Sequence, residues 1–287
     1  MTNRQQNLWS KLATYVALIA ICALAVIPLF WMVSTSLKSD SQIVESPPRW
    51  LPDKLVWNNY RLAISSDWAH FPLWTRNTLI IAALAVVGTT LSSAVVAYGF
   101  AKIRFRGRGV LFAIMLSTMM IPFPVVMVPL FSIFVWMGDH TPIQWLGTTK
   151  PLWAPCWFGS AFSIFLLRQF FITVPDELSE AARIDGCSEW GIFWRIMLPL
   201  SRPALSVVAL FTFMWAWRDF LGPLIYLQRP TQYTLALGLQ TLQSQHGSTP
   251  WNQLMAASVL VILPVLVLFF IAQKTFIEGI ATTGLKG

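Results

Sequence analysis

The sequence predicts an all-α polytopic membrane protein with six transmembrane helices. Of its 287 residues, 56% are hydrophobic and only 11% are charged, and the mean hydropathy is +0.61. Soluble domains carry about 25% charged residues, so this chain has too few to cover a soluble fold. A transmembrane helix needs roughly 20 mostly apolar residues. Six stretches qualify: 13–36, 77–101, 110–136, 151–172, 203–227 and 254–276.

The first stretch has some features of a secretory signal, because Arg4 and Lys11 precede it and the residues at 23–25 resemble a cleavage site. Its apolar run continues through VIPLFWMVSTSL, however, whereas the core of a signal spans only about 7–15 residues. We therefore expect a retained anchor helix.

Orientation follows from Lys and Arg in the short loops, which favour the cytoplasmic side. KIRFRGRG, residues 102–109, places four cations and no acid between the second and third stretches. The other loops on that side, including both chain ends, also hold more Lys and Arg than the opposite side. Both termini are expected to be cytoplasmic.

ELSEAARIDG, residues 177–186, is a polar segment on the same side, between two apolar runs. Asp176 can cap a helix that begins at Glu177, and Gly186 suits the end of that helix. A second amphipathic run, SEWGIFWRIMLPL, continues to Pro199. These patterns predict two short helices with a glycine bend. Paired alanines would allow close approach of another protein, and an ordinary interfacial helix is the alternative.

EAARIDGCSEWGIFWRIMLPL resembles the EAA loop of permease subunits of ABC importers. The resemblance implies that this loop sits in a cleft of a cytoplasmic ATPase and couples its motion to the membrane. It assigns the coupling role to nine residues: Glu180, Ala181, Ala182, Arg183, Asp185, Gly186, Ile196, Leu198 and Pro199.

The resemblance extends over nearly the whole chain and points to the carbohydrate-uptake branch, near the maltose-type second permease. WNNYRLA, AYGFAKIRFRGRG and FLLRQFFITVPDELSEAARIDG all look like that branch. It implies a type I ABC importer permease fold and a single transmembrane domain, 1–287. The coupling loop would cover about 173–202 and an outer loop about 228–253.

The same resemblance implies the partners. They are a second, different permease chain, two copies of the ABC ATPase, an extracytoplasmic solute-binding protein and a carbohydrate substrate, in the cytoplasmic membrane of a bacterium. The chain has no G-x-x-x-x-G-K-[ST] phosphate loop, so we expect no enzyme activity and no cofactor in it, with ATP and Mg bound by the partner ATPase. The cysteines and histidines lack metal-ligand spacing. The net charge of +8 is attributed to membrane topology rather than to nucleic acid.

The fifth stretch holds the candidate substrate path, FMWAWRDFLGPLIYL. Polar groups inside a membrane are costly and mark function, and here Trp215 and Trp217 flank Arg218 and Asp219. Members of the resembled branch have a Trp-Asn-acid sequence at this point, so Arg218 replaces the Asn. Either Arg218 contacts an anionic substrate, or it pairs with an acid of this chain or of a partner. The Gly-Pro step at 222–223 predicts a kink.

The outer loop resembles the segment that reaches into the binding protein in the maltose-type family, with Thr234, Leu235 and Gly238 at the matching positions. The tail FIEGIATTGLKG resembles the family tail that touches the ATPase pair.

Other functions remain open. A permease for a peptide or an amino acid would share the coupling loop. A secondary transporter driven by an ion gradient would need intramembrane carboxylates, for which Asp219 is the one candidate. An intramembrane enzyme would need a His paired with an acid or a Ser at bilayer depth, and none of the three histidines lies in an apolar stretch.

Overall fold

The computed structural model describes residues 3–65, 70–244 and 249–284, and every regular element in these ranges is helical. The chain forms two compact units. One comprises Met1–Ala69 and Leu239–Pro264, and the other comprises His70–Gly238 and Val265–Gly287.

Fifteen α-helices are described in these ranges, together with short 3-10 turns at Thr118–Met120, Ala154–Phe158 and Pro230–Gln232 and a π-helical turn at Phe193–Met197. The α-helices are α1 (Asn3–Ser36), α2 (Asp40–Ile43), α3 (Asn58–Ser65), α4 (Phe71–Lys102), α5 (Arg108–Ser117), α6 (Phe123–His140), α7 (Lys150–Trp153), α8 (Ala161–Thr173), α9 (Asp176–Ile184), α10 (Glu189–Ile192), α11 (Leu198–Leu200), α12 (Arg202–Arg218), α13 (Leu221–Tyr226), α14 (Leu235–Ser244) and α15 (Trp251–Gly284).

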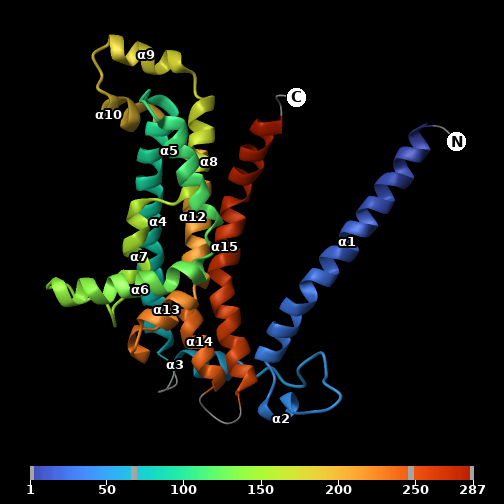
Figure 1. Ribbon diagram of the computed structural model, residues 1–287. Coiled ribbons are helices and arrows are strands. Elements are labelled where there is room, and N and C mark those ends of the chain that lie inside the picture. The colour runs from blue at the N-terminus through green and yellow to red at the C-terminus, as the bar shows by residue number, and fades with distance from the viewer. Residues whose placement is uncertain (1–2, 66–69, 245–248, 285–287) are drawn as a thin grey trace. The chain divides into compact units, whose positions relative to one another are not determined.

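Helix α4 is the centre of the second unit. It packs along both α8 and α12 (Figure 1), and the small size of its buried residues, among them Ala85, Gly88 and Ala94, allows the close approach. Trp157 lies so close to Gly88 that a Cβ there would be 2.6 Å from the indole. The backbone N–H of Ser160 donates to Ser93 Oγ at 3.2 Å. The segment before α8 is therefore fixed against the middle of α4.

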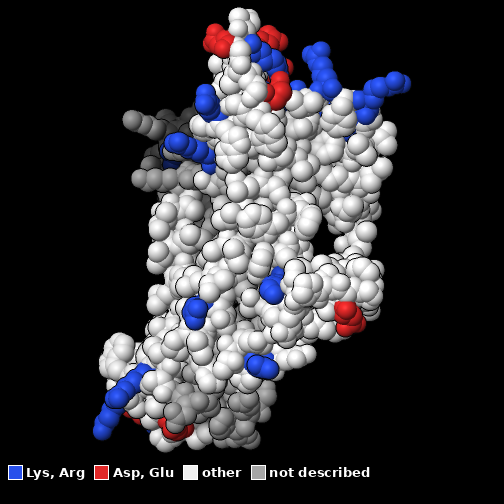
Figure 2. Space-filling view, turned by 90° about the vertical axis from the view of Figure 1, so that its left-hand side faces the viewer, with Lys and Arg blue, Asp and Glu red and all other residues white. Residues whose placement is uncertain are grey.

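Helices α9 and α10 lie at one end of this unit, beyond α4 and α8 (Figure 1). Acidic and basic side chains gather at the end that carries α9 and α10, whereas the surface along the length of the helices shows few charged side chains (Figure 2). This is the distribution expected for an apolar bundle that carries a polar loop outside the membrane.

In the first unit, the turn after α1 is held by the buried Lys38, which is 3% exposed. Its ammonium donates to the carbonyl oxygen of Arg49 at 2.6 Å and lies 4.2 Å from the ring centroid of Trp31. Burial lowers the pKa of this lysine. Asn59 Nδ2 donates to the carbonyl of Lys38 at 2.9 Å, which ties α3 to the same turn.

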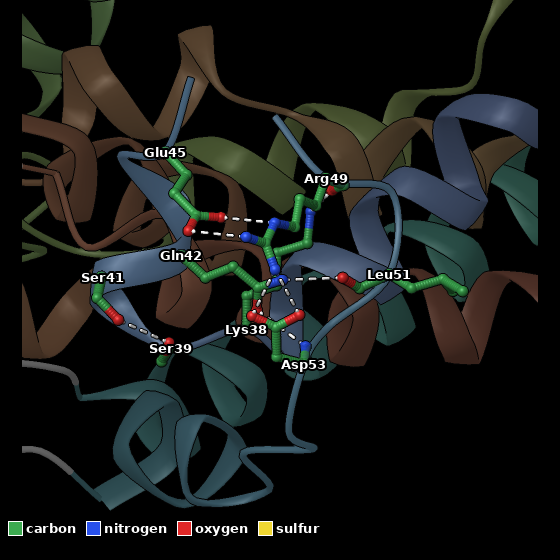
Figure 3. A network of polar contacts seen from close by, with 8 residues as sticks. All are labelled: Lys38, Ser39, Ser41, Gln42, Glu45, Arg49, Leu51 and Asp53. Atoms are coloured by element: carbon green, nitrogen blue, oxygen red, sulfur yellow. Dashed lines mark hydrogen bonds and ion pairs between the residues drawn. The ribbon is translucent and has the colours of Figure 1, made fainter. Parts of the chain in front are cut away.

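The chain that follows folds back over this turn (Figure 3). Arg49 lies between two carboxylates, Glu45 at 3.1 Å and Asp53 at 3.0 Å. Gln42 donates to the carbonyl of Leu51 at 2.8 Å and accepts from the backbone N–H of Asp53 at 3.2 Å. These exposed ion pairs each contribute little, but the backbone contacts define one conformation for residues 38–53.

Five described helices are long and apolar enough to cross a membrane, and a sixth span results if Glu189–Leu200 and Arg202–Arg218, bent by 79°, form one. The first, second and sixth expected spans are confirmed as α1, α4 and α15. The fourth is present as Lys150–Thr173, although a turn at Gly159, with φ +85°, divides it.

The third expected span, 110–136, is wrong as a single helix. The chain breaks between α5 and α6 at Ile121-Pro122, and α6 runs across α4 rather than along it (Figure 1). Ile121 is extended, at φ −83° and ψ 113°, because a residue before proline is disfavoured in the helical conformation. Apolar composition alone did not reveal this break.

The fifth expected span also breaks, three residues before the Gly-Pro step that was expected to kink it. Helix α12 ends at Arg218, Asp219 is extended, and Gly222 and Pro223 lie inside α13. Proline is tolerated in a first turn because the N–H it lacks would have no intrahelical partner there. The break therefore falls at Asp219-Phe220.

Candidate functional site

The loop between α8 and α12 has the predicted architecture of two helices joined at a glycine. Gly186 has φ +81°, and the N–H of Cys187 bonds to the carbonyl of Ala182 at 2.8 Å while that of Gly186 bonds to Arg183 at 3.0 Å. These are the two bonds of a Schellman motif. Gly186 is thus confirmed as the end of α9.

Asp176 does not cap α9. The helix begins at Asp176 itself, and its carboxylate accepts a hydrogen bond from Lys102 Nζ at 2.6 Å instead. The sequence pattern predicted that the carboxylate of Asp176 would accept a backbone N–H of α9. It pairs instead with the ammonium of Lys102 at the end of α4. This hydrogen bond and the lysine charge lower the pKa of Asp176.

The outer face of α9 is open to a partner. Glu180, Ala181 and Arg183 are exposed, and Ile184 exposes 86% of its surface. Asp185 and Gly186 are exposed as well. The inner face is anchored, since Ala182, Ile196 and Leu198 pack against the core around Leu167 and Phe193, while Pro199 is exposed.

A second polar contact fixes the start of α10. Glu189 Oε1 accepts from Arg183 Nε at 2.7 Å, and Glu189 Oε2 accepts from the hydroxyl of Tyr98 at 2.7 Å. Sequence reasoning counted Lys102 only as a topological charge and did not single out Tyr98 or Glu189. The available signal was the spacing of Tyr98 and Lys102, one helical turn apart at the end of an apolar run.

A cavity of about 370 Å³ lies beside α12, within the membrane-spanning part of the second unit. Its wall combines hydroxyl groups with aromatic rings, the mixture of polar and apolar lining that is typical of small-molecule sites. The lining residues are Thr89, Pro155, Cys156, Gly159, Ser160, Phe162, Ser163, Phe211, Thr212 and Trp215. Of the expected path residues, only Trp215 belongs to it.

A second hollow of about 340 Å³ adjoins the first at Trp215 and contains Arg218 and Asp219. Arg218 is exposed, and no ion pair joins it to another residue within the ranges the structure describes. Asp219 instead accepts the backbone N–H of Gly222 at 3.2 Å. The fourth expected residue, Trp217, is buried and stacks on Phe213.

The residues of this chain that were expected to contact the binding protein are buried. Thr234 and Leu235 are 2% and 1% exposed, and the N–H of Leu235 donates to Thr78 Oγ1 at 2.9 Å. A Cβ at Gly238 would lie 2.3 Å from Trp74. These residues fix the loop against α4, so any contact with another protein is made by exposed neighbours. The tail residues 285–287 lie outside the described residues.

Comparison with known proteins agrees with this architecture. The family model for "Binding-protein-dependent transport system inner membrane component" matches residues 90–281. The arabinooligosaccharides transport system permease protein AraQ of Bacillus subtilis is 33% identical over 279 residues, which is 96% of each chain. The sn-glycerol-3-phosphate transport system permease protein UgpE of Yersinia pestis is 32% identical over 271 residues, 93% of this chain and 94% of UgpE.

Among solved structures, a chain of a bacterial ABC transporter involved in the import of the acidic polysaccharide alginate superposes with a TM-score of 0.80. Its identity is 22%, and the match covers 96% of this chain and 98% of that one. The expected all-α, type I ABC importer permease fold is confirmed. The protein belongs to the family of binding-protein-dependent transport system inner membrane components.

Proposed function

We propose that this chain is the permease subunit of an ATP-driven importer for a carbohydrate or a related polyol. As a member of its family it is a transport component of the inner membrane that crosses the bilayer several times. The more specific assignment, to carbohydrate, rests on the cavity beside α12 and on the relatives. Arabino-oligosaccharides, glycerol phosphate and alginate are all rich in hydroxyl groups.

The cavity suits such a ligand. A volume of about 370 Å³ lies within the range of small-molecule sites, roughly 300–1,000 Å³. Thr212 donates to the carbonyl of Val208 at 2.9 Å, and its oxygen retains lone pairs that can accept from a sugar hydroxyl. Trp215, 45% exposed, offers a ring face to the apolar side of a sugar.

The assembly follows from the same proposal. A second, different permease chain would complete the path, two ATPase subunits would bind ATP and Mg on the cytoplasmic side, and an extracytoplasmic binding protein would deliver the ligand. The exposed face of α9 docks on the ATPase, with both termini on that side. This chain performs no bond chemistry itself.

Co-purification tests the assembly. The tagged chain is extracted from its host in mild detergent, and its companions are identified. We expect an ATPase, a second permease and, from its neighbouring coding region, a binding protein. Recovery of the chain alone, or paired only with itself, would contradict the proposal.

Uptake tests the substrate class. The complex is reconstituted with Mg-ATP and offered labelled oligosaccharides, polyol phosphates, amino acids and peptides. Thr212→Val keeps the side-chain shape and removes one hydroxyl, so KM for the carbohydrate should rise about fivefold. Thr14→Val is the matched control, since Thr14 forms the same kind of bond, to Ser10, on exposed α1. Uptake of amino acids or peptides alone would refute the carbohydrate assignment.

An ion-coupled transporter is the competing function. It would require Asp219 to bind and release an ion during transport. The carboxylate of Asp219 already accepts a backbone N–H at the break between α12 and α13, which gives it a structural role. Uptake that persists without ATP and collapses with an ionophore would favour this alternative.

A further inference from the structure

The motif AYGFAK, residues 97–102, ends α4 and has no role in the function described so far. Tyr98 and Lys102 are four residues apart and therefore lie on one face of the helix. Tyr98 is 6% exposed and the side chain of Lys102 is 5% exposed. The polar groups of both side chains contact the loop that carries α9 and α10: the hydroxyl of Tyr98 donates to Glu189, and the ammonium of Lys102 donates to Asp176.

Lys102 binds the joint between α8 and α9. Its ammonium donates to the carbonyl oxygen of Val174 and to Asp176 Oδ1, both at 2.6 Å. Val174 is the residue that follows α8, and Asp176 is the first residue of α9. A buried cation with two oxygen partners holds this joint more firmly than an exposed ion pair does.

Tyr98 binds the other end of the same loop. Its hydroxyl donates to Glu189 Oε2 at 2.7 Å, and the other oxygen of Glu189 accepts from Arg183 at 2.7 Å. Arg183 lies in the last turn of α9, and Glu189 begins α10. One carboxylate thus joins both helices of the loop to α4.

Helix α4 is continuous between the coupling loop and the cavity, so it can transmit a displacement of the loop to the cavity wall. Its only proline is in the first turn, so no proline interrupts it between Lys102 and Thr89, which lines the cavity. These two positions are roughly 20 Å apart at the rise of an α-helix. A shift of the loop would reach the cavity wall through this one helix.

We propose that Tyr98 and Lys102 form a two-point clamp through which movement of the coupling loop is transmitted to α4. They act as positioning residues, because they need not touch substrate or nucleotide. The inference rests on the proposed function, in which an ATPase docks on α9. It deepens that function by naming α4 as the helix that receives the motion.

The test is the number of substrate molecules taken up per ATP hydrolysed, measured in proteoliposomes that contain the full complex and the binding protein. For Lys102→Met and for Tyr98→Phe we expect this ratio to fall at least about fivefold, the lower range of measured couplings between sites, while the ATPase still co-purifies. Lys102→Arg keeps the donors and should recover most of the ratio.

Lys150→Met is the matched control, because Lys150 also donates to a backbone carbonyl, that of Gln144 at 3.0 Å, away from the loop. A purely structural role would reduce the amount of assembled complex and leave the ratio at the wild-type value, and that result would overturn the clamp. If Lys102→Met fails to assemble, the ratio measured for Tyr98→Phe alone tests the clamp, because this variant removes only a single hydroxyl.

The two proposals fail in different ways. A wild-type chain that recovers no ATPase refutes the proposed function and the clamp with it. If the wild-type complex couples normally and both clamp variants take up as much substrate per ATP as the wild type, the clamp is refuted and the proposed function is not.

Discussion

The carboxylate of Asp219 lies directly against Gly222 across the break between α12 and α13. One oxygen accepts the backbone N–H of Gly222 at 3.2 Å, and a Cβ at this glycine would be 2.5 Å from the other oxygen. The carboxylate therefore fills the space that a side chain at position 222 would need.

We expect Gly222→Ala to destabilise the chain by about 1–3 kcal/mol, the usual cost of overpacking, because the methyl group must displace Asp219 or Leu152. The midpoint of thermal unfolding in detergent measures this. Gly99→Ala is the control, since nothing lies within 4 Å of a Cβ there and alanine favours a helix interior. Equal midpoints for the two variants would show that the contact with Asp219 has no such role.

Arg218 should distinguish substrates by charge. It lines the hollow next to Trp215 and is exposed. We expect Arg218→Gln to raise KM for an anionic carbohydrate about tenfold or more, the value of a charged hydrogen bond, with little change for a neutral one. Competition uptake with a matched neutral and anionic pair measures this.

Arg218→Lys retains the charge but not the planar fork, so it should recover part of the affinity. An equal loss for both substrates would contradict substrate contact. It would favour the alternative in which Arg218 pairs with an acid of the second permease.

The start of α9 should depend on pH. The hydrogen bond from Lys102 and then its charge lower the pKa of Asp176. A lowered pKa in the folded state means that the ion pair stabilises the fold above the unfolded pKa of about 3.9, and that this contribution disappears as pH falls through the lowered value. The thermal midpoint of the wild type should therefore exceed that of Asp176→Asn at neutral pH and approach it in acid.

Glu177→Gln is the control for this measurement, because it changes a neighbouring carboxylate and leaves the Lys102 pair intact. Since Asp176 is 69% exposed, solvent screening keeps the effect small. A midpoint difference that does not vary with pH would contradict the ionic contribution.

The coupling role of the loop can be tested at its glycine and at its exposed acid. Gly186 has φ +81°, whereas proline is fixed near about −65°, so Gly186→Pro should abolish uptake by distorting the end of α9. Glu180→Lys reverses a charge on the exposed face and should do the same by weakening ATPase docking. Both chains should still insert in the membrane.

Uptake assays and subunit co-purification check this result. Glu177→Lys is the control for Glu180→Lys, because it reverses an exposed charge on the same helix outside the coupling motif. Wild-type uptake in both test variants at normal subunit levels would remove the coupling role.

Sequence reasoning succeeded where one local property determines the structure. Long apolar runs gave α1, α4 and α15, and the glycine before Cys187 gave the end of α9. The apolar run over 110–136 predicted one helix, but Pro122 disfavours the helical conformation at Ile121, and the helix breaks there. Sequence reasoning also misplaced the break in α12, where an acid rather than the Gly-Pro step marks the end of the helix.

The clamp and the cavity were missed for a different reason. Lys102 and Asp176 are far apart in the chain, as are Thr89 and Thr212, and only tertiary packing brings them together. The buried positions of Thr234 and Leu235 were missed likewise, because a resemblance locates a segment but not which of its side chains face inward.

The burial of Lys38 has a consequence for chemical labelling. In the proposed orientation both Lys38 and Lys54 belong to the loop outside the membrane, and a reagent that cannot cross the bilayer would meet both. Lys54 is exposed, but the amine of Lys38 is enclosed by Trp31 and the carbonyl of Arg49. Its lowered pKa increases the fraction of this amine that is unprotonated, yet enclosure keeps it unmodified while the loop is folded. This amine therefore reports loop opening rather than topology.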